Sequence, residues 1–462
     1  MLLENIGENF EGPSWSNRIF FYFCLFSSLL IIFLLVFISF TAINPDFAIP
    51  NGPHYNSTEL RNMGFFDNER YLISALVQSL AATIALVITL SLVAVQLAAQ
   101  SYSARVIDVY KNNPDMWILL SIYIAVIFYG LGLLKVIDVG VAGINMEFAI
   151  FAAYFLGFFA FICLVPYMLE TLDLLKPSTV IKLLAIDITK EKVLTSISAE
   201  DSTSSKIDPI QPIADMANSA LERNDYATVR DGLTTIKNST IHMLENIRFN
   251  SDEQKDLAEH ILKHLQRIGI QAVKKEDEDS TLSAITCINE IGIKAAERKL
   301  KEFTVSALEM LKNIGTKAVD KKLELAVKKV VLALWDIGTK AAGKELNLAT
   351  ETAVQAIWDV GAKAEDENLE TIAEWVASAL WNVGWEAAFK DLDLAVETAV
   401  QALRDVGIKV AEDKREKETL YIENGLEALM KKAKEKGWTE IMKEIKEALQ
   451  TIEDAKSNKS NT

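Results

Sequence analysis

The stretch LWDIGTKAAGKEL, from Leu334 to Leu346, decides the fold because it returns at a fixed interval. It recurs 23 residues later as IWDVGAKAEDENL, and 23 residues later again as LWNVGWEAAFKDL. One glycine marks every repeat, at Gly269, Gly292, Gly315, Gly338, Gly361, Gly384 and Gly407. A fixed period of this length is typical of a solenoid, in which each unit packs on its neighbours.

The residues around each glycine predict a helix. Apolar residues stand eight, four and one before it and Ala or Val stands three after it, which places them on one helix face. A polar run six and seven residues after the glycine breaks this pattern. The break is required, because an unbroken helix would rotate the apolar face by about 140° per repeat.

Two geometries fit this pattern. One is a pair of short helices with the glycine at the turn between them, and the other is a single helix of about 18 residues with the glycine on its packing flank. The helix pair is favoured, because glycine destabilises a helix interior by about 1 kcal/mol and is a natural residue after a helix end.

The first third of the chain differs from the repeats in charge. Only 6 of the 47 Lys and Arg residues and 13 of the 63 Asp and Glu residues precede residue 176. A bilayer is crossed by about 20 helical residues. Four apolar segments are long enough, at roughly 19–43, 72–99, 116–134 and 148–169. Lys and Arg in the flanking loops favour cytoplasmic termini, with the loop from Asn44 to Arg70 outside.

The second apolar segment carries a polar stripe. Ser74, Gln78, Thr89, Gln96 and Gln100 fall close to one face at helical spacing. The favoured interpretation is a packing face, since small and polar residues let membrane helices approach and bond to one another. The alternative is a pore wall built from several copies of the chain, although the segments carry no ionisable residue near their centres.

Three consecutive repeats have tryptophan three residues before the glycine, at Trp335, Trp358 and Trp381. With Trp375 and Trp385 nearby, the middle of the array is aromatic, and the three equivalent positions predict a ladder along the solenoid. The favoured interpretation is that these rings cover a groove between helices. The alternative is an exposed surface for a protein partner or the membrane.

Residues suited to catalysis or metal binding are sparse. The three cysteines are scattered, at Cys24, Cys163 and Cys287, which favours neither a disulfide framework nor a zinc cluster. His260 and His264 stand four residues apart and could hold a metal with Asp256, but a solvated helix face is the favoured interpretation. We therefore expect no cofactor, no metal site and no enzymatic activity. The net charge of −16 speaks against a nucleic-acid partner.

Two stretches resemble a known family. VAVQLAAQSYSARVI, from Val93 to Ile107, and DPIQPIADMANSALERNDYATVRDGLTTI, from Asp208 to Ile236, are similar to segments of a family of uncharacterised prokaryotic membrane proteins. Those proteins have four spans and a cytoplasmic part. The resemblance covers roughly Ile19 to Ile236 and implies a topology without an activity, and the repeats beyond Asn250 depart from it.

These observations predict an all-α protein, a four-helix transmembrane bundle followed by a cytoplasmic α-solenoid. The predicted divisions are an N-terminal tail 1–18, a transmembrane domain 19–175, a linker and helical segment 176–250, repeats 251–415, and capping helices with a disordered tail 416–462. The predicted function is anchoring of a protein-binding scaffold to the bilayer. The alternative is a homo-oligomeric channel or transporter with a regulatory cytoplasmic domain.

Overall fold

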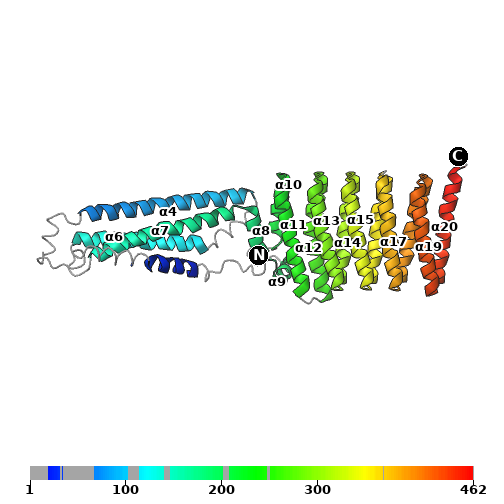
Figure 1. Cartoon of the computed structure of the whole chain (residues 1–462), viewed down its shortest axis with the longest axis horizontal. Helices are drawn as coiled ribbons and strands as arrows, with labels where there is room; N and C mark the ends of the chain where they lie inside the picture. The colour runs from blue at the N-terminus through cyan, green and yellow to red at the C-terminus, as the bar shows by residue number, and fades with distance from the viewer. Residues whose placement is uncertain are drawn as a thin grey trace. The chain divides into compact units, whose positions relative to one another are not determined.

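The computed structural model describes residues 19–31, 34, 67–101, 114–139, 146–200, 208–246, 250–367 and 369–460. Every regular element in these ranges is a helix, which confirms the all-α fold class. The chain divides into two compact units, Met1–Ile186 and Asp187–Thr462. The first unit holds the apolar helices and the second holds the repeats (Figure 1).

The first unit is built on three long apolar helices that pack on one another, followed by a short one. They are α4 (Asp67–Ser101), α6 (Pro114–Val139), α7 (Met146–Leu174) and α8 (Pro177–Ala185). Segments of the three long helices are long and apolar enough to cross a membrane: Asp67–Val93, Asp115–Ile137 and Phe148–Asp173. The predicted first span is described over Ile19–Ile31 and residue 34, and its remainder, like residues 44–66 of the predicted outer loop, lies outside the described residues.

The interior of the first unit is apolar, and a few polar groups also link its helices. Leu80, Tyr123 and Phe159 are buried where α4, α6 and α7 meet. The hydroxyl oxygens of Ser91 and Tyr167 lie 2.5 Å apart and join α4 to α7. Large apolar side chains also cover the outside of these helices. This arrangement suits helices surrounded by lipid.

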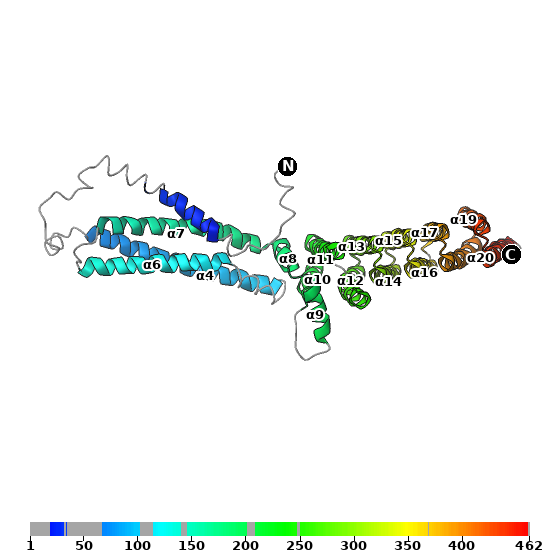
Figure 2. The same cartoon turned by 90° about the horizontal axis from the view of Figure 1, so that it is seen from below.

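The second unit is an array of helices in two layers. It consists of α9 (Lys190–Glu200), α10 (Gln211–Glu222), α11 (Tyr226–Asn246), α12 (Ser251–Lys274), α13 (Glu278–Glu297), α14 (Lys301–Asp320), α15 (Glu324–Gly343), α16 (Asn347–Asp366), α17 (Glu370–Phe389), α18 (Asp393–Glu412), α19 (Glu416–Lys436) and α20 (Thr439–Ser460). From α11 onward each helix packs on the next and on the next but one. From α10 to α20, odd-numbered helices therefore form one layer and even-numbered helices the other, whereas α9 packs on α12 (Figure 2).

Each 23-residue repeat is one helix and one turn. The helices α13 to α18 each have 20 residues, and three residues separate consecutive helices. All seven repeat glycines lie inside helices, from Gly269 in α12 to Gly407 in α18. The predicted helix pair with the glycine at the turn is therefore wrong, and the alternative of a single helix per repeat is the observed geometry.

The turn lies seven residues after the glycine and uses ordinary side chains. Lys299, Lys322 and Glu345 have φ angles of 57°, 54° and 62°, in the left-handed region. Two backbone hydrogen bonds close the first of these turns: Lys299 N–H donates to the Ala296 carbonyl at 3.0 Å, and Leu300 N–H to that of Ala295 at 2.9 Å. This is the Schellman arrangement that commonly ends helices.

The repeat glycine marks the point where three helices approach closely. A β-carbon placed on Gly315 would lie 2.8 Å from Val330 Cγ1 on the next helix and 3.1 Å from Val360 Cγ2 on the helix after that. One placed on Gly384 would lie 2.9 Å from the β-carbon of Ala399. The glycine is therefore required by packing, and its weak helix propensity, about 1 kcal/mol, is outweighed by the contacts it permits.

Candidate functional site

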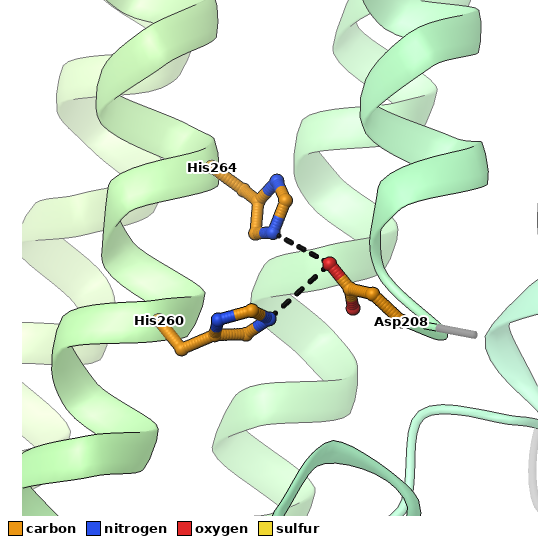
Figure 3. A group of neighbouring side chains, drawn as sticks. All are labelled: Asp208, His260 and His264. Carbon is orange, nitrogen blue, oxygen red and sulfur yellow. Dashed lines mark ion pairs between the residues drawn. The ribbon is translucent and has the colours of Figure 1, made fainter. Parts of the chain in front are cut away.

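Three side chains of the second unit converge near the start of the array. Asp208 lies three residues before α10, and His260 and His264 lie on α12. Oδ2 of Asp208 is 3.2 Å from Nε2 of His260 and 3.0 Å from Nε2 of His264 (Figure 3). We call these three residues the Asp-His-His cluster.

Local structure fixes the two imidazoles on one face. The Asn250 side chain accepts a hydrogen bond from Glu253 N–H at 2.8 Å and caps α12, so the helix begins well before the histidines. A spacing of four residues places His260 and His264 one above the other, with ring centroids 5.1 Å apart. The Asp208 carboxylate is oriented by Ile210 N–H, which donates to its other oxygen, Oδ1, at 2.9 Å.

The cluster is largely shielded from solvent. His264 is 4% exposed, and Nε2 of His260 is buried without a hydrogen-bond partner of good geometry. Burial alone would raise the pKa of the Asp208 carboxyl. The contacts with His260, with His264 and with Ile210 N–H outweigh it and hold this pKa well below its usual range. Asp208 is therefore a carboxylate anion at neutral pH.

The donor set is one that transition metals accept. One ligand atom from each of the three residues lies within 4.8 Å of the others. Two imidazole nitrogens and a carboxylate oxygen form a common set for Zn²⁺ and for related divalent cations. Three protein ligands leave a fourth tetrahedral position for water or another molecule.

The structure corrects the interpretation of the two histidines. A solvated helix face was expected, yet His264 is buried and His260 only partly exposed. Asp256, the predicted third ligand, is exposed, and Asp208 takes its place. The sequence did not indicate Asp208 as a candidate ligand, because it lies 52 residues before His260. Only the packing of α10 against α12 brings it there.

The polar stripe of α4 points away from the rest of the described first unit. Gln78, Thr89 and Gln96 are exposed, whereas α4 packs on its neighbours through another face, represented by Leu80 and Val87. At 100° per residue the two faces are roughly 180° apart, on opposite sides of the helix. Ser74 is partly buried and receives a hydrogen bond from Gln78 at 3.3 Å. The side chain of Gln100 lies outside the described residues.

The three equivalent tryptophans do not form one ladder. Trp335, Trp358 and Trp381 lie on α15, α16 and α17, so Trp358 is in the layer opposite to the other two. All three are partly buried at the edge of the packed helix face. Trp381 instead contacts Trp385 on its own helix and Tyr421 on α19, with ring centroids 6.4 Å and 6.2 Å apart.

Comparison with known proteins bears on the first half of the chain. Residues 17–233 match the model of a family described as "Predicted membrane protein (DUF2254)". The matching segment begins and ends within a few residues of the resemblance found in the sequence, which is thereby confirmed, and the glycine repeats lie beyond it. We conclude that the chain is a membrane protein whose spanning helices precede a helical repeat region.

Two further comparisons concern whole chains. No curated protein matches the chain. A solved structure described as "Circular tandem repeat protein with novel repeat topology and enhanced subunit contact surfaces" is similar, with a TM-score of 0.40 and 12% identity, over 84% of this chain and 98% of that one.

Proposed function

We propose that the protein anchors a cytoplasmic helical-repeat scaffold to the bilayer and that this scaffold binds a protein partner. In this proposal both termini are cytoplasmic and the protein acts by binding, without enzymatic activity. The supporting observation is a set of aromatic side chains that gather on the surface of the array.

This aromatic strip follows one face of α17 and continues onto α19. Trp381, Trp385 and Phe389 stand at four-residue intervals, and the rings of Trp385 and Phe389 have centroids 5.5 Å apart. Phe389 is 50% exposed and Tyr421 is 36% exposed. The Lys432 ammonium lies 4.1 Å from the centroid of the Phe389 ring. Accessible aromatic rings beside a cation are typical of protein-binding surfaces, where tryptophan and tyrosine contribute most of the affinity.

Crosslinking in cells tests this surface. A photoreactive amino acid at Phe389 should give discrete adducts with a partner protein, and the variant Trp385→Ala should lose them. The matched control is Leu348 on α16, which is 44% exposed in the other layer and should give none of these adducts. Equal adducts at both positions, or none at Phe389, would contradict the proposed binding surface.

Proteolysis tests the proposed topology. A protease added outside intact cells should cut between Asn44 and Arg70 and leave the segment from Lys190 to Thr462 whole. Cleavage of that segment from outside would reverse the topology.

A second candidate function rests on the outward polar face of α4. Exposed glutamine and threonine are unfavourable against lipid, and a ring of chains around this face would form the wall of a channel. Thr89→Cys, in a chain with Cys24→Ala, should then form a disulfide between two copies in the membrane. Leu90→Cys is the control, because Leu90 is 48% exposed but lies about 100° further around the helix. Failure of Thr89→Cys to crosslink more than Leu90→Cys would exclude this candidate.

A further inference from the structure

We propose that the Asp-His-His cluster is a binding site for a divalent transition-metal cation of the Zn²⁺ class, with Asp208, His260 and His264 as ligands. The site belongs to the second unit and shares no residue with the aromatic strip. Its cation would hold the segment before α10 on α12, the first helix of the repeat array.

The spacing of the three donor atoms fits such a cation with little movement. Ligands bound to Zn²⁺ at about 2.0–2.1 Å in a tetrahedral arrangement lie about 3.3 Å from one another. The two nitrogen-to-oxygen distances in the cluster are 3.0 Å and 3.2 Å. The three ligand atoms all lie within 4.8 Å of one another, so a cation placed among them requires the two imidazoles to turn toward it by no more than about 1.5 Å.

The chemistry of the donors selects the class of cation. Imidazole nitrogen suits Zn²⁺, Co²⁺ and Ni²⁺, whereas Mg²⁺ and Ca²⁺ prefer sites made of oxygen. The cation would also give a partner to the buried Nε2 of His260, which has no hydrogen bond of good geometry. The negative charge of the Asp208 carboxylate would compensate one of the two positive charges of the cation, while the two neutral imidazoles add no charge.

Arg267 decides how tightly the cation binds. Its Nη2 lies 3.3 Å from Nδ1 of His264, and because a guanidinium group only donates, Nδ1 is the acceptor and the proton of His264 sits on Nε2. Metal binding at Nε2 requires this proton to move to Nδ1, where it would face the guanidinium. Arg267 is exposed and can turn toward solvent, so it weakens the site without blocking it. A metal-bound histidine ordinarily donates its other N–H to an acceptor.

The proposal is tested on the full-length protein in detergent, freed of metal with a chelator and titrated with Co²⁺. We expect one Co²⁺ per chain with visible absorption, displaced by Zn²⁺ and not by Mg²⁺. Asp208→Asn and His264→Gln should each weaken binding by at least about 10-fold, and Arg267→Glu, which places an acceptor beside Nδ1, should tighten it by about 10-fold. His242→Gln is the control, because His242 is exposed on α11, outside the cluster.

Three outcomes would overturn the site. They are the absence of Co²⁺ absorption in the unaltered protein, binding by Asp208→Asn as tight as by His242→Gln, and displacement of Co²⁺ by Mg²⁺. Circular dichroism monitors folding of each variant. If His264→Gln does not fold, the opposite effects expected of Asp208→Asn and Arg267→Glu on Co²⁺ affinity still test the site. A cluster with a purely structural role would give no Co²⁺ absorption, and Arg267→Glu would not tighten Co²⁺ binding.

Discussion

A β-carbon placed on Gly338 would lie 2.8 Å from the β-carbon of Ala353 on the following helix. Real β-carbons do not approach so closely, and neither atom can move without its backbone. It would also lie 3.0 Å from Val383 Cγ2, one helix further on. The glycine of this repeat is thus a contact surface for two helices.

Gly338→Ala should lower the free energy of unfolding of the array by about 1–3 kcal/mol, because overpacking exceeds the gain in helix propensity. Urea unfolding of the fragment Asp187–Thr462 measures this change. Gly343→Ala on the same helix is the control: the nearest atom to its new β-carbon is Glu386 Oε1, at 3.8 Å. It should leave stability unchanged or raise it by up to about 1 kcal/mol. A stabilising Gly338→Ala would refute the close approach.

Lys299→Gly should raise the free energy of unfolding by about 1 kcal/mol. Lys299 has a φ of 57°, and its β-carbon is strained in the left-handed region, where glycine is not. The same change at Lys263, an exposed position inside α12, should lower stability by about 1 kcal/mol. Equal effects at the two positions would contradict the turn geometry.

Glu444→Gln should stabilise the array at neutral pH and have little effect in acid. Burial and the nearby carboxylate of Glu397 on α18 raise the pKa of Glu444 above its ordinary value. The folded state therefore binds this proton more tightly than the unfolded state does, and it loses stability as the pH rises from about 4.3 through the raised pKa. Urea unfolding at several pH values measures the difference.

Glu397→Gln should reproduce that benefit, because it removes the same repulsion. The double variant should gain less than the sum of the two single variants. Additive gains would show that the two carboxyl groups do not interact.

The fragment Asp187–Thr462 should fold without the membrane helices and give a strongly helical circular dichroism spectrum. Its buried residues form a continuous core, and each helix from α11 to α18 packs on the two helices that follow. A spectrum of an unfolded or β-rich chain would end the solenoid interpretation.

The sequence pattern predicted the helical period and its breaks correctly, because these depend on residues close together in the chain. The apolar positions around Gly315, such as Leu311 and Ile314, are buried as expected. The place of the glycine was predicted wrongly, because helix propensity is a local property and the contact with Val360 is made two helices away.

The candidate metal site could be predicted only in part. The spacing of His260 and His264 predicted that the two side chains share one helix face. The burial of that face depends on the packing of α10, and so does the position of Asp208, the third residue of the cluster. The prediction of a tryptophan ladder was wrong for a related reason. Equivalent positions in consecutive repeats lie in opposite layers, which a 23-residue period does not reveal.

Because consecutive helices lie in opposite layers, the layer of each helix depends on whether the number of repeats before it is odd or even. Deleting or inserting one 23-residue unit would reverse the direction of every later helix and move it to the opposite layer, so the aromatic rings of α17 would open onto the other side of the molecule. Deleting or inserting two units would keep every later surface on its own side. Growth or loss by 46 residues is therefore the change of length that this protein can accept while keeping both of its faces.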